Sequence, residues 1–276
     1  MVQLLKGKAV ADSLTERTKE KVRQLAACGK TPTLAIVRLG ENPGDISYEK
    51  GALKRAADTG IEVRRMIYDE AVSQEDLIAE IRKLNADASI DGVLMFRPLP
   101  AHIDEKKVCE TLDPAKDVDG ITSGSLAGVF TDSGEGFPPC TAEACMEMLE
   151  HYGVDLCGKK VTVFGRSLVI GKPVAMMAMK RNATVTTCHS RTRAEDFKEA
   201  GRNADVVIAA IGRAKMIGEE MLGDGQIVLD VGINVDEDGK LCGDVDFDAV
   251  EPKAAMITPV PGGIGSVTTA VLMKHV

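Results

Sequence analysis

A glycine- and proline-rich segment near the C-terminal end of the chain has the composition of a ligand-binding loop. Residues 258–265 read Thr-Pro-Val-Pro-Gly-Gly-Ile-Gly, between a strand-like run at 255–257 and a helix-like run at 267–272. Prolines fix the backbone φ angle, and glycines let a backbone approach a flat ligand closely. A surface turn is the alternative, but a loop that opens a helix is a common place for a ligand. The segment therefore predicts a binding site.

A second segment has the strand, turn and helix of a dinucleotide site. The apolar run 161–164 ends at Gly165, a second glycine follows at Gly171, and a helical pattern continues to Met179. The spacing does not fit G-x-G-x-x-G, so the generic fingerprint is absent. Because helix N-termini attract anions, we favour phosphate contact over simple helix capping for Arg166 and Ser167. The predicted cofactor contacts of this turn are Gly165, Arg166, Ser167, Gly171 and Pro173.

The next strand ends in residues that bear on the choice of cofactor. The run 183–188 is followed by His189, Ser190 and Arg191. In an NAD site an acidic residue usually follows this strand and binds the ribose diol. Ser190 and Arg191 offer a hydroxyl and a cation instead, which favours a 2′-phosphate and predicts NADP. A solvated loop residue remains the alternative for Arg191 taken alone.

Composition bounds the class of protein. The 276 residues are 44% hydrophobic and 28% charged, which is typical of a soluble chain with one large or two medium domains. A net charge of −8 without a long basic run argues against nucleic acid as a partner. We expect no membrane partner, since no apolar stretch is long enough to span a bilayer and the N-terminal residues lack the apolar core of a signal peptide. Seven cysteines without paired short spacings fit reduced thiols in the cytoplasm, and four scattered histidines predict no metal site.

The elements that must position these residues alternate along the chain. Helices are predicted at 8–27, 43–58, 73–85 and 141–152, and strands at 33–37, 61–68, 92–96, 161–164, 183–188, 206–210 and 227–231. This alternation predicts an α/β fold with mainly parallel sheets covered by helices. The glycine- and serine-rich stretch 122–139 is the predicted connection between two domains.

Taken in order, the motifs resemble the methylenetetrahydrofolate dehydrogenase/cyclohydrolase family over essentially the whole chain. The matching segments are Gly40-Glu41-Asn42-Pro43 with Tyr48, Pro98-Leu99-Pro100, residues 116–120, Pro139-Cys140-Thr141, residues 165–173, 230–234, 243–245 and 258–265. The resemblance implies a folate-binding catalytic domain at 1–120 plus 266–276 and a Rossmann-type NADP-binding domain at 140–262. It also implies that folate lies in a cleft between the domains and that the protein is a homodimer.

The resemblance assigns roles to residues on both domains. It implies that Tyr48 packs on the pterin ring and that Asp119 hydrogen-bonds to it, as the catalytic and substrate-binding pair. The alternatives are a packing role for Tyr48 and a turn or cap role for Asp119. The other implied folate contacts are Pro98, Leu99, Pro261, Gly262 and Gly263, and Ile233 joins the cofactor contacts. Cys140 is expected to be structural.

Two positions depart from the family pattern. The family carries a lysine four residues after the tyrosine and a glutamine before its Leu-Pro-Leu-Pro turn, and these positions hold Ala52 and Phe96 here. Lys50 and Lys54 point ~160° away from Ala52 around a helix. Arg97, one residue beyond Phe96 on a strand, should face the other side.

The departures bear on only one of the family's two reactions. Hydride removal from the one-carbon bridge of methylenetetrahydrofolate depends mainly on positioning, whereas ring opening of the methenyl product by water needs proton transfers. The sequence therefore predicts an NADP-dependent methylenetetrahydrofolate dehydrogenase with weak or lost cyclohydrolase activity. The alternatives are the full bifunctional enzyme, with Arg97, a lysine or water replacing the lost groups, and a folate- or nucleotide-binding protein without catalysis.

Overall fold

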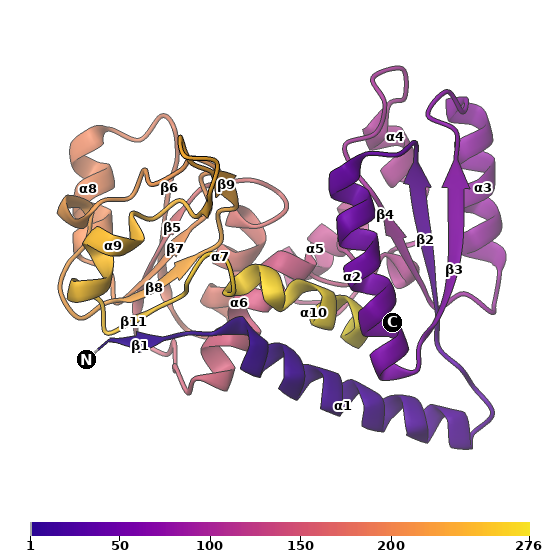
Figure 1. Ribbon diagram of the computed structural model, residues 1–276, viewed down its shortest axis with the longest axis horizontal. Coiled ribbons are helices and arrows are strands. Elements are labelled where there is room, and N and C mark those ends of the chain that lie inside the picture. Colours follow the sequence, from indigo (N-terminus) through magenta and orange to yellow (C-terminus); the bar gives the residue numbers. More distant parts are fainter. Residues whose placement is uncertain (1) are drawn as a thin grey trace. The chain divides into compact units, whose positions relative to one another are not determined.

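The computed structural model describes residues 2–276, which form two compact α/β units (Figure 1). The six-stranded unit contains the N-terminal segment up to Ala11 and Thr141–Thr268. The three-stranded unit contains Asp12–Cys140 and Thr269–Val276. Helices α1 (Gly7–Ala27) and α10 (Thr268–His275) each contribute residues to both units. The α/β class and the parallel sheets predicted from the sequence are confirmed.

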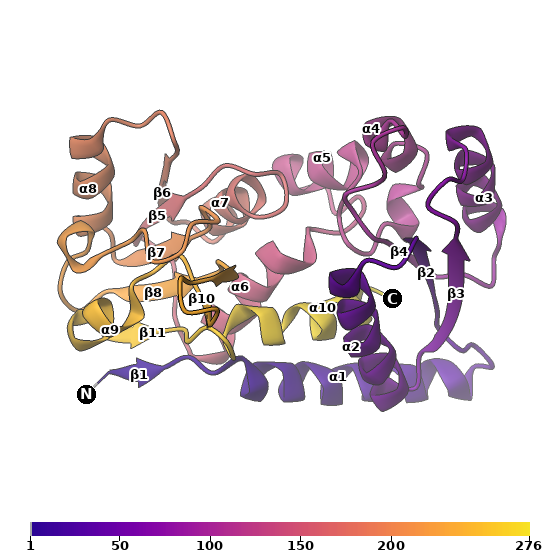
Figure 2. The same cartoon turned by 45° about the horizontal axis from the view of Figure 1, so that its top comes forward.

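The three-stranded unit is a parallel sheet with a helix on either side. Its strands are β2 (Thr33–Leu39), β3 (Glu62–Tyr68) and β4 (Gly92–Met95), in the order β3-β2-β4. Helix α2 (Pro43–Thr59) connects β2 to β3, and α3 (Gln74–Ala86) connects β3 to β4 in the opposite direction. Right-handed connections that run in opposite directions place their helices on opposite faces of the sheet, as Figures 1 and 2 show.

Local sequence sets the ends of helix α2. The Asn42 side-chain oxygen accepts a hydrogen bond from the Gly44 amide at 2.8 Å, and Pro43 occupies the first turn. Gly60 ends the helix in the left-handed region, at φ 83°. The predicted helix at 43–58 is thus confirmed, with Tyr48 and Ala52 on it.

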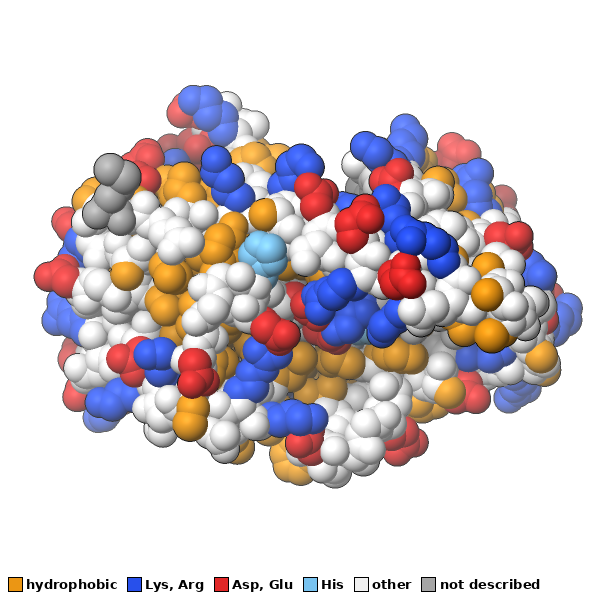
Figure 3. All heavy atoms as spheres, turned by 90° about the horizontal axis from the view of Figure 1, so that it is seen from below, with side chains coloured by type: hydrophobic (Ala, Val, Ile, Leu, Met, Phe, Trp, Pro, Cys, Tyr) orange, Lys and Arg blue, Asp and Glu red, His pale blue; other side chains and the backbone are white. Residues whose placement is uncertain are grey.

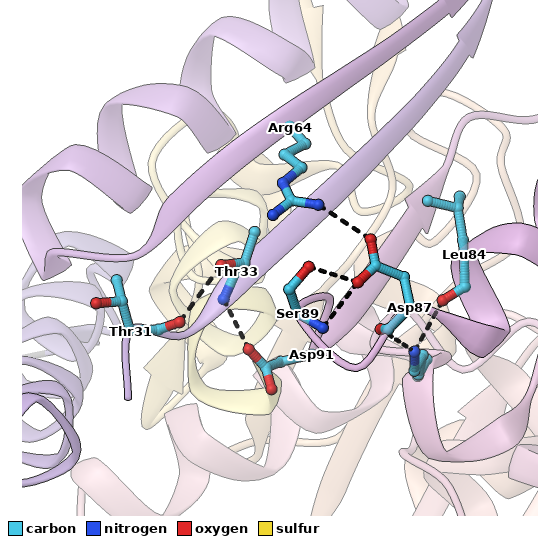
Figure 4. A network of polar contacts seen from close by, with 8 residues as sticks. Thr31, Thr33, Arg64, Leu84, Asp87, Ser89 and Asp91 are labelled. Carbon is cyan, nitrogen blue, oxygen red and sulfur yellow. Dashed lines mark hydrogen bonds and ion pairs between the residues drawn. The ribbon is translucent and has the colours of Figure 1, made fainter. Parts of the chain in front are cut away.

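Polar contacts fasten the amino ends of the strands in this unit (Figure 4). The Thr33 amide donates to Asp91 Oδ2 at 2.9 Å, and Arg64 Nη1 lies 3.0 Å from Asp87 Oδ2. Lys116 Nζ donates to the carbonyl oxygens of Leu84 and Asp87. The opposite, carboxyl-end edge is the one at which open α/β sheets bind ligands.

The six-stranded unit is a fully parallel sheet with the order β1-β11-β8-β7-β5-β6. Its strands are β1 (Gln3–Leu4), β5 (Lys160–Phe164), β6 (Thr184–Cys188), β7 (Val206–Ala209), β8 (Ile227–Asp230) and β11 (Met256–Ile257). From β5 the chain passes through α7 (Gly171–Lys180) to β6, and through α8 (Ala194–Arg202) to β7 on the other side of β5. The order reverses between β5 and β7, where a ligand crevice is expected.

Two features of the chain differ from the sequence predictions. Strand β1 pairs with β11, so the N-terminal segment lies with the six-stranded unit, whereas the predicted first domain begins at residue 1. The predicted connection at 122–139 contains helix α5 (Ser123–Thr131) and belongs to the three-stranded unit. Buried Ser125 donates to Asp117 Oδ2 at 2.7 Å, which fixes this stretch although its composition resembles a linker.

The remaining elements are short or join the two units. They include α4 (Glu105–Cys109), α6 (Cys140–His151), α9 (Phe247–Val250) and the antiparallel pair β9 (Asn234–Val235), labelled in Figure 1, and β10 (Leu241–Cys242), labelled in Figure 2. Acidic and basic side chains are interspersed over the face shown in Figure 3. Across residues 2–276, none of the helices combines the length and the apolar character needed to cross a membrane.

Candidate active site

A pocket of about 520 Å³ opens where the strand order of the six-stranded sheet reverses. Its walls come from the carboxyl ends of β5, β6 and β7 and from helix α8. The lining residues include Gly165, Arg166, Ser167, His189, Ser190, Lys198, Ile211 and Arg213. This is the position at which parallel α/β sheets hold a nucleotide.

Two glycines bring the backbone of this pocket close together. Gly165 has φ 125°, and a Cβ there would lie 2.1 Å from the Ala210 carbonyl oxygen. A Cβ at Gly171 would lie 2.4 Å from the Gly165 carbonyl oxygen. Any larger residue would force β5 apart from β7 or from the start of α7. Gly171 and Pro173 are buried in the first turn of α7 and are not among the residues that line the pocket.

Ser167 lies in the turn just before helix α7. Its Oγ accepts a hydrogen bond from the Ile170 amide at 3.2 Å, immediately before α7 begins. The same residue lines the pocket beside Arg166. The N-cap of α7 is Ile170, which has no side-chain cap hydrogen bond, so Ser167 fastens the turn rather than capping the helix.

The cations of the pocket are only partly those that the sequence indicated. Arg166 and Ser190 line it, whereas exposed Arg191 is not a lining residue and its amide donates to His189 Nδ1 at 3.2 Å. Lys198 on α8 and Arg213 after β7 line the pocket and were missed. Arg213 follows a glycine at the carboxyl end of a strand, which is a signal that could have identified it.

A smaller pocket of about 180 Å³ lies at the carboxyl ends of β8 and β11. It brings together the predicted folate contacts Pro261, Gly262 and Gly263 with Ile233, which was predicted to contact the cofactor. Ile233 is 67% exposed. The amide of Gly7 donates to the Gly262 carbonyl at 2.8 Å, so the start of α1 fastens this loop.

Two buried carboxylates hold the loops around both pockets. Asp244 accepts hydrogen bonds from the amides of Ile211, Gly212 and Arg213, at 2.5, 3.0 and 2.8 Å. Asp230 accepts from the amides of Gly232, Asp244 and Val245, at 3.1, 2.9 and 2.9 Å. Asp230 thus anchors the loop that carries Asp244, and in return Asn234 Nδ2 donates to Asp244 Oδ1 at 2.9 Å. These bonds explain why the Asp-Val-Gly-Ile-Asn and Gly-Asp-Val segments occur together.

Burial opposes the charge on Asp230. Loss of water around its carboxyl raises its pKa to about 6; the three amide donors act to lower the pKa, and nearby Asp244 acts to raise it. The residue is 3% exposed and its carboxyl accepts three backbone amides, so its role is to hold the loops.

The three-stranded unit brings Tyr48 and Phe96 into contact. Their rings meet edge to face, with centroids 5.8 Å apart and an interplanar angle of 84°. Ala52, one turn after Tyr48, is 0% exposed. Arg97 Nη1 lies 3.7 Å from Glu105 Oε1. The two positions at which the family pattern has polar groups therefore hold a buried methyl group and an aromatic ring.

Asp119 is half-buried at the end of a tight loop in the same unit. Desolvation raises the pKa of its carboxyl to about 6, against the lowering effects of a hydrogen bond from Cys140 and the positive charge of Arg97. Its neighbour Asp117 has the structural role instead, since it is 0% exposed and accepts from the amides of Ile121 and Thr122 at 3.0 and 2.7 Å. Asp117 forms the turn, which leaves Asp119 available for a ligand.

A third pocket, of about 520 Å³, lies at the carboxyl ends of β2, β3 and β4. Pro98 and Leu99 line it, together with Glu41, Asp45 and Glu70. Tyr48 and Asp119 are not lining residues. Of the predicted folate contacts of this unit, Pro98 and Leu99 therefore line this pocket.

The fold and the pockets define a two-unit α/β protein with a nucleotide site on its six-stranded sheet. Residues 5–119 match the catalytic domain of tetrahydrofolate dehydrogenase/cyclohydrolase, and residues 139–276 match its NAD(P)-binding domain. The chain belongs to the tetrahydrofolate dehydrogenase/cyclohydrolase family. This confirms the family and the enzyme class predicted from the sequence.

Individual relatives agree over the full length. The chain is 50% identical to the bifunctional protein FolD of Clostridioides difficile, over 99% of this chain and 95% of the relative. It is 49% identical to that of Carboxydothermus hydrogenoformans, over 100% and 96%. The crystal structure of the bifunctional FolD enzyme from Campylobacter jejuni has a TM-score of 0.96 at 38% identity, with 100% of this chain and 97% of that chain covered. The Trypanosoma brucei enzyme, complexed with NADP cofactor and inhibitor, has a TM-score of 0.92 at 34% identity, with 99% and 95% covered.

Proposed function

We propose that the protein oxidises 5,10-methylenetetrahydrofolate to 5,10-methenyltetrahydrofolate with NADP. The observation that carries this proposal is the cation-lined pocket at the strand-order reversal of the NAD(P)-binding domain. The family supplies the substrate class, and the relative from Trypanosoma brucei is a solved complex with NADP.

The residues of the six-stranded unit fit the cofactor. Gly165 and Gly171 let the end of β5, the end of β7 and the start of α7 pack closely around the turn that would receive a pyrophosphate, because a Cβ at either position would meet another carbonyl oxygen. Arg166 and Ser190 bind the 2′-phosphate, with Arg191 beside them, as the absence of an acidic residue after β6 favours. Gly171 and Pro173 set the start of α7, and Ile233 borders the nicotinamide end. NADP, when bound, supplies the hydride acceptor.

The three-stranded unit positions the substrate. Tyr48 packs against the pterin ring and Asp119 accepts hydrogen bonds from it. Pro98 and Leu99, together with Pro261, Gly262 and Gly263, complete the folate contacts. Residues 1–120 with 266–276 remain the proposed folate-binding domain and residues 140–262 the proposed NADP-binding domain, apart from the N-terminal segment, which pairs with β11. A cytoplasmic homodimer likewise remains a proposal.

Weak cyclohydrolase activity is the finer part of the proposal. Its support is that Phe96, in contact with Tyr48, and buried Ala52 occupy the positions of the family's glutamine and lysine. Neither the phenyl ring of Phe96 nor the methyl group of Ala52 can transfer a proton. General acid–base assistance is typically worth about 10²–10⁴-fold in rate. Without it, a separate hydrolytic enzyme must consume the methenyl product.

The names of the relatives favour a second candidate, the full bifunctional enzyme. In that case Arg97, a lysine or an ordered water would assist hydration. Arg97 is partly exposed and loosely paired with Glu105, which leaves its guanidinium able to approach a ligand.

One pair of assays tests the proposal and separates the candidates. Methenyl formation from methylenetetrahydrofolate is followed with NADP, and methenyl hydrolysis is followed separately against the buffer rate. We expect substantial dehydrogenation and hydrolysis near the buffer rate. Hydrolysis far above the buffer rate would establish the bifunctional enzyme, and absence of both activities would leave a binding protein.

A further inference from the structure

Helix α8 directs its charged side chains to different places. Ala194, Phe197 and Lys198 line the pocket at the strand-order reversal, and their spacing of three and four residues defines one face of a helix. Asp196 and Glu199 instead line a separate groove beside β5 and β6. Within Ala194–Arg202, Lys198 is therefore the charged residue that faces this pocket.

The cations that line this pocket have no carboxylate beside them. They are Arg166, Lys198 and Arg213, and within residues 2–276 no aspartate or glutamate lines the same pocket. Across that part of the chain, none of these three side chains forms an ion pair or a hydrogen bond. Outside the lining, by contrast, Arg193 pairs with Asp196 at 2.8 Å. The uncompensated positive charge of the pocket favours a ligand with several negative charges.

The order of the strands indicates which phosphate Lys198 would meet. In a dinucleotide fold the adenosine ribose lies at the carboxyl end of the second strand, which is β6 here. Ser190 follows β6, and α8 with Lys198 comes next in the chain. Arg213 follows β7, which lies on the other side of β5. Lys198 thus shares the ribose end of the pocket with Ser190, whereas Arg213 lies toward the other end.

We propose that Lys198 is a specificity-determining residue for NADP, whose ammonium group binds the 2′-phosphate together with Arg166 and Ser190. The inference rests on the proposed use of NADP. A phosphate monoester carries a charge of about −1.5 to −2 near neutral pH, so one arginine balances only part of it. Arg191 lies outside the lining of the pocket, and Lys198 supplies the second cation. A lysine on its flexible stem meets a phosphate as a point charge.

The test measures binding directly, by isothermal titration calorimetry of the full-length protein with a pair of adenosine probes. Adenosine 2′,5′-bisphosphate carries the 2′-phosphate, and adenosine 5′-monophosphate lacks it. Lys198→Ala should weaken binding of the bisphosphate about ten- to a hundredfold, the usual effect of losing a charge-assisted contact, and should leave binding of the monophosphate unchanged. Lys198→Arg keeps the charge and should retain tight binding. Lys160→Ala, at an exposed lysine that begins β5 at the amino end of the sheet, is the matched control.

Steady-state kinetics give a second measurement. In Lys198→Ala the ratio of kcat/KM for NADP to kcat/KM for NAD should fall by the same factor, while the KM for methylenetetrahydrofolate stays constant. Lys198→Glu should lower this ratio further, because it places a carboxylate beside the phosphate, and should leave the use of NAD intact. Retained NAD-dependent activity in these variants separates a lost phosphate contact from poor folding.

Each outcome decides the inference. If Lys198→Ala distinguishes the two probes as strongly as the unaltered protein does, the inference is overturned and the proposed use of NADP stands. An equal loss of affinity for both probes would also overturn it, because Lys198 would then contact a part of the cofactor that NAD and NADP share. If the unaltered protein itself binds both probes equally, the proposed preference for NADP fails together with the inference.

Discussion

The edge of one aromatic ring meets the face of the other where Tyr48 and Phe96 come together, with centroids 5.8 Å apart. Such pairs are worth roughly 0.5–1.5 kcal/mol beyond their buried area. Tyr48 comes from helix α2, and Phe96 immediately follows strand β4. The contact therefore fixes the tyrosine with an apolar partner at a position where the family pattern has a glutamine.

The first prediction follows from this contact. The double variant Ala52→Lys with Phe96→Gln should raise methenyl hydrolysis by ~10²-fold or more, since it supplies a proton-transferring amine and a hydrogen-bonding partner together. Ala52→Lys alone should lower the melting temperature and add little hydrolysis, because it places an amine at a fully buried position without its hydrogen-bonding partner. Hydrolysis rates and thermal unfolding of the single and double variants check this.

Lys54→Ala and Arg97→Ala test whether either side chain takes over the role of the missing lysine and glutamine in hydrolysis. Both should leave hydrolysis unchanged, near the buffer rate, in the unaltered background. A large drop in either variant would mean that the unaltered protein already hydrolyses the methenyl compound through that residue.

How well the sequence predicted the structure differs from segment to segment. Periodicity located β2, α2, β3, α3 and β4 because caps such as Asn42 and Gly60 agree with the hydrophobic pattern. It failed at 122–139, where Ser125 is fixed by buried Asp117, a tertiary contact that leaves no local signal. It also failed at β1, a two-residue strand whose only support is its partner β11.

The same contrast holds for the site. The turn at Gly165 was predictable because a strand, a glycine and a helix are contiguous in the chain. Lys198 was not, since it reaches the pocket from α8, and only the strand order places it beside Arg166. Arg213 had a weaker local signal, its position after Gly212 beyond the end of β7.

Cofactor choice gives the second prediction. Arg166→Ala should weaken NADP binding by about ten- to a hundredfold while changing NAD binding little, because a charge-assisted hydrogen bond is worth roughly 1.5–3 kcal/mol. Arg191→Ala should have a smaller effect, since Arg191 is exposed and lies outside the lining of the pocket. Initial rates with both cofactors measure this, with Arg193→Ala as the control, because Arg193 pairs with Asp196. Equal use of NAD and NADP by the unaltered protein would contradict the assignment.

The third prediction concerns the loops held by Asp230. Asp230→Asn should destabilise the protein by about 2–3 kcal/mol, since the amide nitrogen would face one of three backbone donors and leave it unsatisfied. Urea unfolding at pH 8, where a carboxyl with a pKa of about 6 is ionised, measures the loss. Asp238→Asn, at an exposed position in the same segment, should change stability by less than about 0.5 kcal/mol. Equal stability of the two variants would show that the anchoring bonds contribute nothing.

The last prediction is the pH dependence of folate use. Burial raises the pKa of Asp119 to about 6, so its carboxyl is ionised above that pH and protonated below it. An ionised carboxylate accepts hydrogen bonds from the pterin, whereas the protonated form loses acceptor capacity. The kcat/KM for methylenetetrahydrofolate should therefore fall as pH drops through about 6, and Asp119→Asn should lower it at pH 8 and remove this acid limb. The KM for NADP should stay nearly constant in both proteins, because its proposed contacts lie on the six-stranded unit. Persistence of the same limb in Asp119→Asn would assign the titration to another group and return Asp119 to a turn residue.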